Sequence, residues 1–280
     1  MKTAIIGLGL IGGSAALVLR DKGFSNETIG VDNNTEHALQ AVELNIVNKV
    51  MPLEAAVKEA DLIIIAVPVD RARTILPKVL DLLDSHQVVI DMGSTKGTIV
   101  HDVAGHPKRG RFVACHPMWG TEFSGPTAAT VRAFTGKASI ICNVAESDED
   151  AGKLARKVLE TLGMYVLYMD AEDHDVHTAY ISHISHITSF ALANTVLEKE
   201  KEEKAIFDLA SAGFESTVRL AKSNATTWVP IFRQNKENLL DVLNEHLTQL
   251  RKFKSCLEKE NWEYLKELIE NANKIKKILH

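Results

Sequence analysis

Cysteine is scarce in this sequence, with only 3 in 280 residues, at Cys115, Cys142 and Cys256. Because these thiols are few, odd in number and far apart, we expect neither a disulfide framework nor a cysteine-based zinc site. Their scarcity fits a reducing compartment, so we expect a cytoplasmic protein. Aromatic residues are also few, at 6%, but 45% hydrophobic and 25% charged residues are typical of a globular chain of one or two domains.

Long apolar runs and an excess of positive charge are missing too. No stretch of about 18 uninterrupted apolar residues occurs, so we expect no membrane-spanning helix. The apolar segment after Lys2 resembles a signal peptide, but glycines interrupt it and cleavage would remove the motif described next, so we expect no export. A formal charge of -5 argues against a nucleic-acid-binding surface, although a small anionic ligand could still bind a local Arg or Lys.

A glycine motif stands near the start of the chain. Residues 2–6, KTAII, have the pattern of a short buried strand, and Gly7-Leu8-Gly9-Leu10-Ile11-Gly12 follows at once. A segment of helical composition comes next, and a second strand over residues 28–32 ends in Asp32, 20 residues after Gly12. This order of strand, glycine turn, helix and acidic strand end predicts a dinucleotide-binding unit.

Each part of the motif has a physical reason. Gly7 permits the tight turn, Gly9 lets the backbone approach a pyrophosphate, and Gly12 lets the helix pack closely on the strand. The phosphates would lie at the helix N-terminus, near Leu10 and Ile11, where free N–H groups and the helix dipole favour negative charge.

Asp32 predicts which dinucleotide is bound. Its carboxylate can accept hydrogen bonds from the adenosine ribose, and it would repel the 2′-phosphate of NADP. No arginine stands near it in the sequence, so we expect the cofactor to be NAD. The alternative to dinucleotide binding as a whole is a glycine-rich turn in an unrelated α/β domain.

The alternation of strands and helices continues to residue 170. Apolar strand patterns occur within residues 61–70, 87–97, 111–117, 138–143 and 165–170. Such runs are typical of strands buried on both faces of a parallel sheet, whose ligands bind at the carboxyl ends of the strands. We therefore expect Val67, Pro68, the segment 93–96 and His116 to line one crevice with the glycine motif.

After residue 170 only helical patterns remain. Residues 171–204 could form one long helix, and the segments 205–224, 226–260 and 261–279 are also helical in composition. In the last segment, apolar residues up to Leu279 recur at a spacing of three and four, as in an amphipathic helix.

The predicted fold class is therefore α/β: an N-terminal Rossmann-type doubly wound parallel sheet followed by an all-α C-terminal domain. We place the dinucleotide-binding domain at residues 1–170 and the helical domain, for substrate binding and dimerisation, at residues 171–280. Long apolar helix faces need covering, so we expect a homodimer through the helical domain.

Several motifs coincide with those of a known family. In chain order they are GLGLIGGS (7–14), DMGSTKG (91–97), HPMWGTEFSG (116–125), HD (174–175), SHISH (182–186) and GFESTVRLAKSNATTW (213–228). With them the chain resembles the prephenate dehydrogenases, enzymes of tyrosine biosynthesis. The resemblance implies the oxidative decarboxylation of prephenate to 4-hydroxyphenylpyruvate, with hydride transfer to NAD.

The resemblance also implies catalytic roles. His116 matches the family's catalytic histidine, and a neutral imidazole, with an ordinary pKa of about 6.5, suits the acceptance of a hydroxyl proton. Taken alone, His116 would more readily be a strand-end histidine bonded to the backbone. Ser94 matches an active-site serine that can orient His116 or the substrate hydroxyl, although a serine there could simply cap a helix. Lys96 is the rival general base.

Substrate-binding residues follow from the same resemblance. Arg219 matches an arginine that grips a carboxylate, and its guanidinium can do so with two hydrogen bonds. His186 and His183, three residues apart and thus neighbours on a helix face, are expected substrate contacts, with packed core histidines as the alternative. Thr121 and Glu122 lie in a loop that the family uses near the substrate.

The sequence departs from the family pattern near these residues. Val218, Asn224-Ala225 and Ser185 stand where the family usually has Thr, Asp-Pro and Pro. We expect no metal, because the histidine pair has no third ligand at metal spacing.

Other functions remain open at this stage. Arogenate dehydrogenase runs the same chemistry on an amine-bearing substrate, and other hydroxyacid or imine oxidoreductases share the two-domain build. A non-catalytic NAD-binding regulator is the alternative from a different class.

Overall fold

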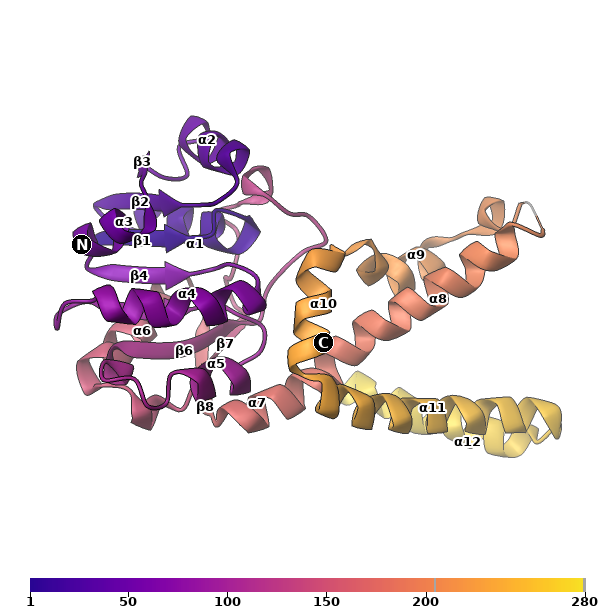
Figure 1. The fold of residues 1–280 in the computed structure, drawn as a ribbon. Coiled ribbons are helices and arrows are strands. Elements are labelled where there is room, and N and C mark those ends of the chain that lie inside the picture. The colour runs from indigo at the N-terminus through magenta and orange to yellow at the C-terminus, as the bar shows by residue number, and fades with distance from the viewer. Residues whose placement is uncertain (204, 279–280) are drawn as a thin grey trace. The chain divides into compact units, whose positions relative to one another are not determined.

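The structure is a computed structural model that describes residues 1–203 and 205–278 (Figure 1). The predicted helix residue Leu279 therefore lies outside the described residues. The chain divides into two compact units, Met1–Asn235 and Lys236–His280. Within the described residues, none of the helices combines the length and the apolar character needed to cross a membrane.

An 8-stranded sheet forms the centre of the first unit, with the strand order β3-β2-β1-β4-β5-β6-β7-β8 (Figure 1). The strands are β1 (Lys2–Ile6), β2 (Glu27–Val31), β3 (Lys49–Val50), β4 (Leu62–Ile65), β5 (Val88–Asp91), β6 (Phe112–Pro117), β7 (Ala138–Cys142) and β8 (Tyr165–Met169). Every predicted strand is present, and only the short β3 is additional.

Helices cover both faces of this sheet. They are α1 (Leu10–Asp21), α2 (Thr35–Glu43), α3 (Leu53–Glu59), α4 (Val69–Leu82), α5 (Gly97–Asp102) and α6 (Glu149–Thr161). Successive strand residues point to opposite faces, so Ile64 joins the core under α1 and α6, whereas Ile63 and Ile65 join the core under α3, α4 and α5. The doubly wound Rossmann-type fold is thus confirmed.

The sheet is not parallel throughout, which the strand patterns did not indicate. Strand β7 pairs antiparallel with β6, and β8 is parallel to β7. The connection between β6 and β7 contains no α-helix, only the 3-10 turn η2 (Pro126–Ala128). A parallel neighbouring strand would need a crossover connection, usually a helix. The connection between β6 and β7 has no such helix and turns back directly, as an antiparallel pair allows. Residues 118–137 therefore start from the carboxyl end of β6, where ligands are expected.

A helical region completes the first unit after β8. It comprises α7 (Ala171–Thr178), the π-helical turn η4 (Ala179–His183), α8 (Ile184–Glu200), η5 (Phe207–Leu209), α9 (Ala212–Val218), η6 (Arg219–Lys222) and α10 (Ala225–Gln234). The predicted long helix after residue 170 is helical up to residue 200, but the π-turn interrupts its regular hydrogen bonding.

The second unit consists of α11 (Lys236–Glu258), α12 (Trp262–Ala272) and η7 (Asn273–Lys277). Helices α11 and α12 pack against each other. The all-α character predicted for the C-terminal part of the chain is confirmed for its described residues, with a helix break at Asn235 that the sequence did not indicate.

Candidate active site

The glycine motif forms a tight turn between β1 and α1. Gly7 has a φ of +97°, and a Cβ there would lie 2.6 Å from the carbonyl oxygen of Ala66. A Cβ on Gly12 would collide with the carbonyl oxygen of Gly7, so helix and turn are in close contact. At Gly9, by contrast, a Cβ would meet no described atom within 4 Å. The turn is therefore closed on its inner side and open where a pyrophosphate would approach.

Asp32 lies beside this turn. Its two carboxylate oxygens accept hydrogen bonds from the backbone N–H of Leu8, at 2.8 Å, and of Asn34, at 2.9 Å. Helix α1 begins at Leu10 and Ile11, with Gly9 as its N-cap, so its first N–H groups have no partner within the helix.

Val67 and Pro68 follow β4, which is paired with β1 in the sheet. All the predicted cofactor-binding residues thus meet at one edge of the sheet, and the open glycine turn, the helix N-terminus and the acidic strand end fit NAD.

His116 lies near the carboxyl end of β6 and is 8% exposed. Its carbonyl oxygen accepts a hydrogen bond from the Ser139 hydroxyl on β7 at 3.2 Å. Its side chain contacts α7, where His116 Nδ1 and His174 Nε2 are 2.7 Å apart. The histidine is therefore held by buried polar contacts on both its backbone and its ring.

The contact continues from His174 to Asp175. His174 Nδ1 lies 2.8 Å from Asp175 Oδ1, and the same carboxylate accepts the backbone N–H groups of Lys96, at 2.8 Å, and Gly97, at 2.9 Å. In the sequence, His174 and Asp175 form the HD motif of the family pattern. Its contact with His116 spans 58 residues and was not predicted.

Burial controls the ionisation of these histidines. It lowers the pKa of His116 well below the ordinary value of about 6.5, and the neighbouring His174, Lys96 and His183 lower it further. Burial also lowers the pKa of His174, against the opposing effect of its hydrogen bond with Asp175. At neutral pH the His116 ring is therefore uncharged and able to accept a proton.

Lys96 forms an ion pair with Asp91 in the interior of the protein. The two side chains are 0% and 1% exposed. Asp91 also accepts the backbone N–H of Gly93 at 2.9 Å and that of Cys115 at 3.2 Å. The Lys96 ammonium is thus engaged by Asp91 inside the protein, and this geometry does not suit Lys96 as a general base.

Ser94 follows β5 in the loop that precedes α5 and is half-buried. The N-cap position of α5 is Lys96, not Ser94. The Ser94 hydroxyl makes no hydrogen bond with any residue that the structure describes, His116 included. It is thus available to a ligand rather than used by the fold.

His183 and His186 gather around Trp228 of α10. The His186 ring stacks on the Trp228 ring at a centroid distance of 3.4 Å, and His183 meets it edge-on at 6.0 Å. His183 Nδ1 is also 3.1 Å from Asn235 Nδ2. Burial lowers the pKa of His183 to about 4 and also lowers that of His186. Trp228 is therefore part of this histidine cluster.

Glu122 and Arg219 form an ion pair across 97 positions of sequence, with Arg219 Nη1 3.4 Å from Glu122 Oε2. The Arg219 side chain is 53% exposed, and that of Glu122 is 22% exposed. Thr121 accepts the backbone N–H of Phe123 at 3.3 Å within the same loop. The loop after β6 and the predicted carboxylate-binding arginine are thus in contact, which the sequence did not predict.

Two family profiles match almost the whole chain. The profile described as "Prephenate dehydrogenase, nucleotide-binding domain" matches residues 15–168, and "Prephenate dehydrogenase, dimerization domain" matches residues 170–271. The chain belongs to the prephenate dehydrogenase family. In this chain the dinucleotide turn follows β1 and the buried His116 lies near the end of β6, with β4 and β5 between the two strands.

Individual members of the prephenate dehydrogenase family are similar over nearly the full length. The prephenate dehydrogenase of Bacillus subtilis (strain 168) is 32% identical over 271 residues, which cover 95% of this chain and 73% of that protein. A crystal structure of prephenate dehydrogenase from A. aeolicus in complex with hydroxyphenyl propionate and NAD+ has a TM-score of 0.90 and 33% identity, covering 99% of this chain and 97% of that one. The structure of Synechocystis arogenate dehydrogenase has a TM-score of 0.79 and 26% identity, covering 100% of both chains.

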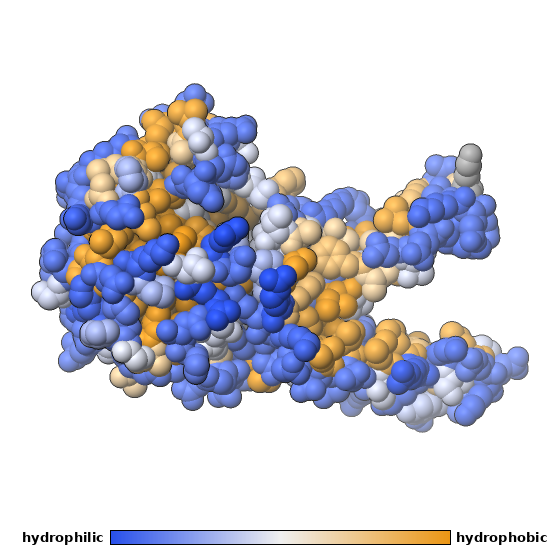
Figure 2. Space-filling view, in the orientation of Figure 1, coloured by the Kyte–Doolittle hydropathy of each residue, from blue (hydrophilic) through white to orange (hydrophobic). Residues whose placement is uncertain are grey.

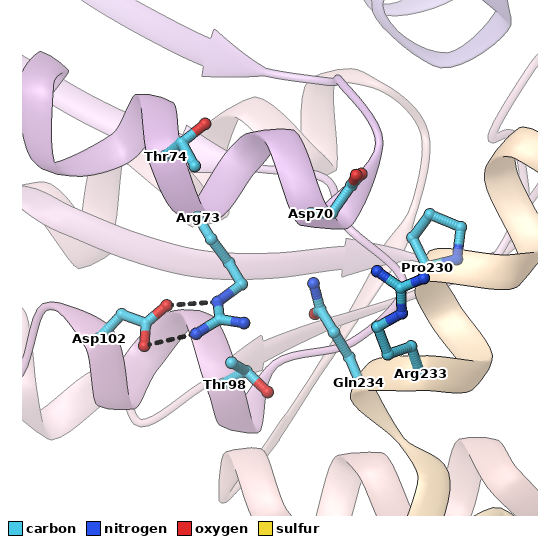
Figure 3. A pocket seen from close by; sticks show the side chains of 8 residues that line it. All are labelled: Asp70, Arg73, Thr74, Thr98, Asp102, Pro230, Arg233 and Gln234. Atoms are coloured by element: carbon cyan, nitrogen blue, oxygen red, sulfur yellow. Dashed lines mark hydrogen bonds and ion pairs between the residues drawn. The ribbon is translucent and has the colours of Figure 1, made fainter.

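A hollow of about 380 Å³ lies between α4, α5 and α10 (Figure 3). It is lined by Asp70, Arg73, Thr74, Thr98, Asp102, Pro230, Arg233 and Gln234. None of the residues predicted for the prephenate dehydrogenase site lines it, and Arg73 pairs with Asp102 across it at 2.5 Å. Gln234 accepts a hydrogen bond from the Thr95 hydroxyl at 2.7 Å, which ties α10 to the loop that carries Ser94.

Proposed function

We propose that this chain catalyses the NAD-dependent oxidative decarboxylation of prephenate to 4-hydroxyphenylpyruvate, in tyrosine biosynthesis. The observation that carries the proposal is a buried, uncharged His116 at the end of β6, at the same edge of the sheet as the dinucleotide turn. Family membership and the prephenate dehydrogenase activity named for the Bacillus subtilis relative support the choice of substrate.

The chemistry asks little of the protein beyond a base, an orienting group and carboxylate anchors. When bound, NAD supplies the acceptor for the hydride that leaves the ring carbon. His116 accepts the proton of the hydroxyl on that carbon, so that positive charge does not build up on the oxygen. Loss of carbon dioxide then gives an aromatic ring, and the same imidazole can return its proton to the phenol oxygen. Ser94, with its unengaged hydroxyl, orients the substrate hydroxyl.

The anionic substrate requires positive charge and hydrogen-bond donors. Arg219 is the carboxylate anchor, because a half-exposed guanidinium with one weak 3.4 Å ion pair can still bind a second carboxylate. His186 and His183 contact the substrate from the cluster around Trp228. Thr121 and Glu122 contribute to substrate binding from the loop after β6, and the Glu122 carboxylate faces Arg219.

The domain roles, assembly and location belong to the same proposal. Residues 1–170 bind the cofactor, and residues 171–280 contribute substrate binding and a homodimer interface in the cytoplasm. Figure 2 shows apolar side chains at the surface of the helical region. Exposed apolar residues of this region include Ile181 of η4, Leu197 of α8 and Val229 of α10. Such faces need covering. A monomer in sedimentation at micromolar concentration would contradict the dimer.

One assay tests the function directly. The purified protein is mixed with NAD or NADP and with prephenate or arogenate, and absorbance of the reduced cofactor is followed. We expect turnover with NAD and prephenate. Turnover with arogenate but not with prephenate would show that arogenate is the substrate. No turnover in any of the four combinations would contradict the proposed function.

A further inference from the structure

A short series of buried groups leads from His116 into the protein interior. His116 is 8% exposed, His174 is 1% exposed and Asp175 is 5% exposed. The two contacts that join them, at 2.7 Å and 2.8 Å, have the length of good hydrogen bonds. Burial strengthens such bonds and makes an unsatisfied group costly, so each contact must join one donor to one acceptor.

The direction of these bonds is fixed at the Asp175 end. Asp175 Oδ1 accepts the backbone N–H of Lys96, and Oδ2 accepts that of Gly97. Backbone amides can only donate, so they favour an ionised carboxylate, which in turn can only accept. His174 Nδ1 must therefore carry a hydrogen that it donates to Asp175.

The direction then passes from ring to ring. A neutral imidazole carries one N–H, so a hydrogen on Nδ1 of His174 leaves its Nε2 as an acceptor. The hydrogen in the 2.7 Å contact must come from His116 Nδ1, which leaves His116 Nε2 without a hydrogen. That bare nitrogen is the atom that a general base needs.

We propose that His174 and Asp175 are positioning residues, which fix the tautomer of His116 so that its Nε2 accepts the substrate hydroxyl proton. The inference rests on the proposed role of His116 as the base. In the step, the substrate O–H bond breaks and an Nε2–H bond forms with the nitrogen lone pair. The positive charge that appears on His116 is stabilised through His174 by the carboxylate of Asp175.

The charged groups around His116 are consistent with this role. Lys96 and its partner Asp91 lie on the β5 side, His183 belongs to η4, and His174 and Asp175 belong to α7. Before reaction, burial above all keeps His116 uncharged, and the positive charge of Lys96 acts in the same direction. During reaction, Asp175 is the anion connected to it by hydrogen bonds.

The first test is Asp175→Asn. An asparagine has no negative charge and one acceptor oxygen in place of two, so in either orientation its amide nitrogen opposes the backbone N–H of Lys96 or of Gly97. The variant therefore weakens the bond that fixes His174 and loses the anion that stabilises the protonated form of His116. By analogy with the catalytic triad, we expect kcat to fall about a hundredfold or more, while KM for substrate changes less than about threefold. The exposed α7 residue His177, replaced by Leu, is the matched control and should leave kcat unchanged.

The second test compares His174→Gln with His174→Met. The two side chains have similar shape, but only Gln offers an oxygen acceptor to His116 Nδ1–H. We expect the Gln variant to keep at least about tenfold more kcat than the Met variant, at matched thermal stability. A purely structural role would lower both variants alike, and equal kcat values would overturn the inference.

The third test needs no turnover. In ¹⁵N spectra of histidine-labelled protein at neutral pH, we expect a protonated Nδ1 and an unprotonated Nε2 for His116, assigned by comparison with His116→Asn. In His174→Met, where the His116 Nδ1–H loses its acceptor, we expect the population of the Nδ1-protonated form to fall. A protonated Nε2 in the unaltered protein would overturn the inference. If His116→Asn retains normal turnover while the tautomer is as expected, the proposed base fails and the tautomer assignment stands.

Discussion

The buried pair of Lys96 and Asp91 allows the sharpest stability prediction. The two side chains are 0% and 1% exposed, so neither charge can reach water when the other is removed. In Asp91→Asn the ammonium loses its counter-ion, and the amide can replace only part of the carboxylate's bonds to Gly93 and Cys115. Breaking such a pair from one side costs about 3–5 kcal/mol. We expect that loss in the free energy of unfolding.

Urea unfolding at neutral pH, followed by tryptophan fluorescence at fixed protein concentration and without added NAD, measures this quantity. Lys96→Met should cost a similar amount, and the Asp91→Asn/Lys96→Met double variant should cost clearly less than the sum. Lys153→Met, which breaks the exposed pair with Glu149, is the control and should not change the midpoint. A loss below about 1 kcal/mol for Asp91→Asn, the range of exposed pairs, would refute the reasoning.

The same pair has a consequence for catalysis. After burial and His174, Lys96 is among the groups that lower the pKa of His116. Removing its positive charge in Lys96→Met should therefore raise that pKa, and the acid limb of the kcat/KM profile should move to higher pH. An acid limb that stays in place or moves to lower pH would show that Lys96 does not act on the base.

Further predictions concern the site and its pH dependence. His116→Asn should lower kcat about a hundredfold or more with little change in substrate KM, as expected for loss of a general base; near-normal kcat would reject that role. Arg219→Ala should act mainly on substrate KM, raising it about tenfold or more, and an unchanged KM would contradict the carboxylate contact. Gly9→Val should raise the KM for NAD in steady-state kinetics without lowering Tm, because a side chain there meets no described atom but occupies the cofactor's approach. His183 has a pKa of about 4 in the folded protein and about 6.5 when unfolded, so the unfolded state binds more protons between these values. Stability should therefore fall as pH drops from about 6.5 to 4, and His183→Asn should reduce that slope in urea titrations.

Local patterns in the sequence predicted the local parts of the molecule. The strand before Gly7, the turn itself and Asp32 all lie within one stretch of chain, and their spacing is dictated by the βαβ unit. The apolar strand runs likewise marked each major strand. A strand pattern has no direction, however, so the antiparallel pairing of β7 with β6 could not be read from it.

The sequence did not predict which residues far apart in the chain are in contact. His116 and His174 are 58 positions apart, and Glu122 and Arg219 are 97 positions apart. No periodicity links such pairs, because their meeting depends on how α7, η6 and the loop after β6 pack. The sequence nevertheless indicated which residues to expect at the site, because the resemblance to the family points to His116, Arg219 and the HD motif. Their roles in substrate binding and catalysis stay predictions.

The π-turn η4 holds one residue more than a regular α-helical turn. Because the extra residue is taken up within that turn, α7 and α8 keep the phase of one continuous helix, and His174 and His186 keep their places beside His116 and Trp228. Deleting one residue within Ala179–His183 would restore regular hydrogen bonding but remove the wide turn that carries His183. A better-formed helix would therefore alter the histidine cluster while leaving α7 and α8 in phase.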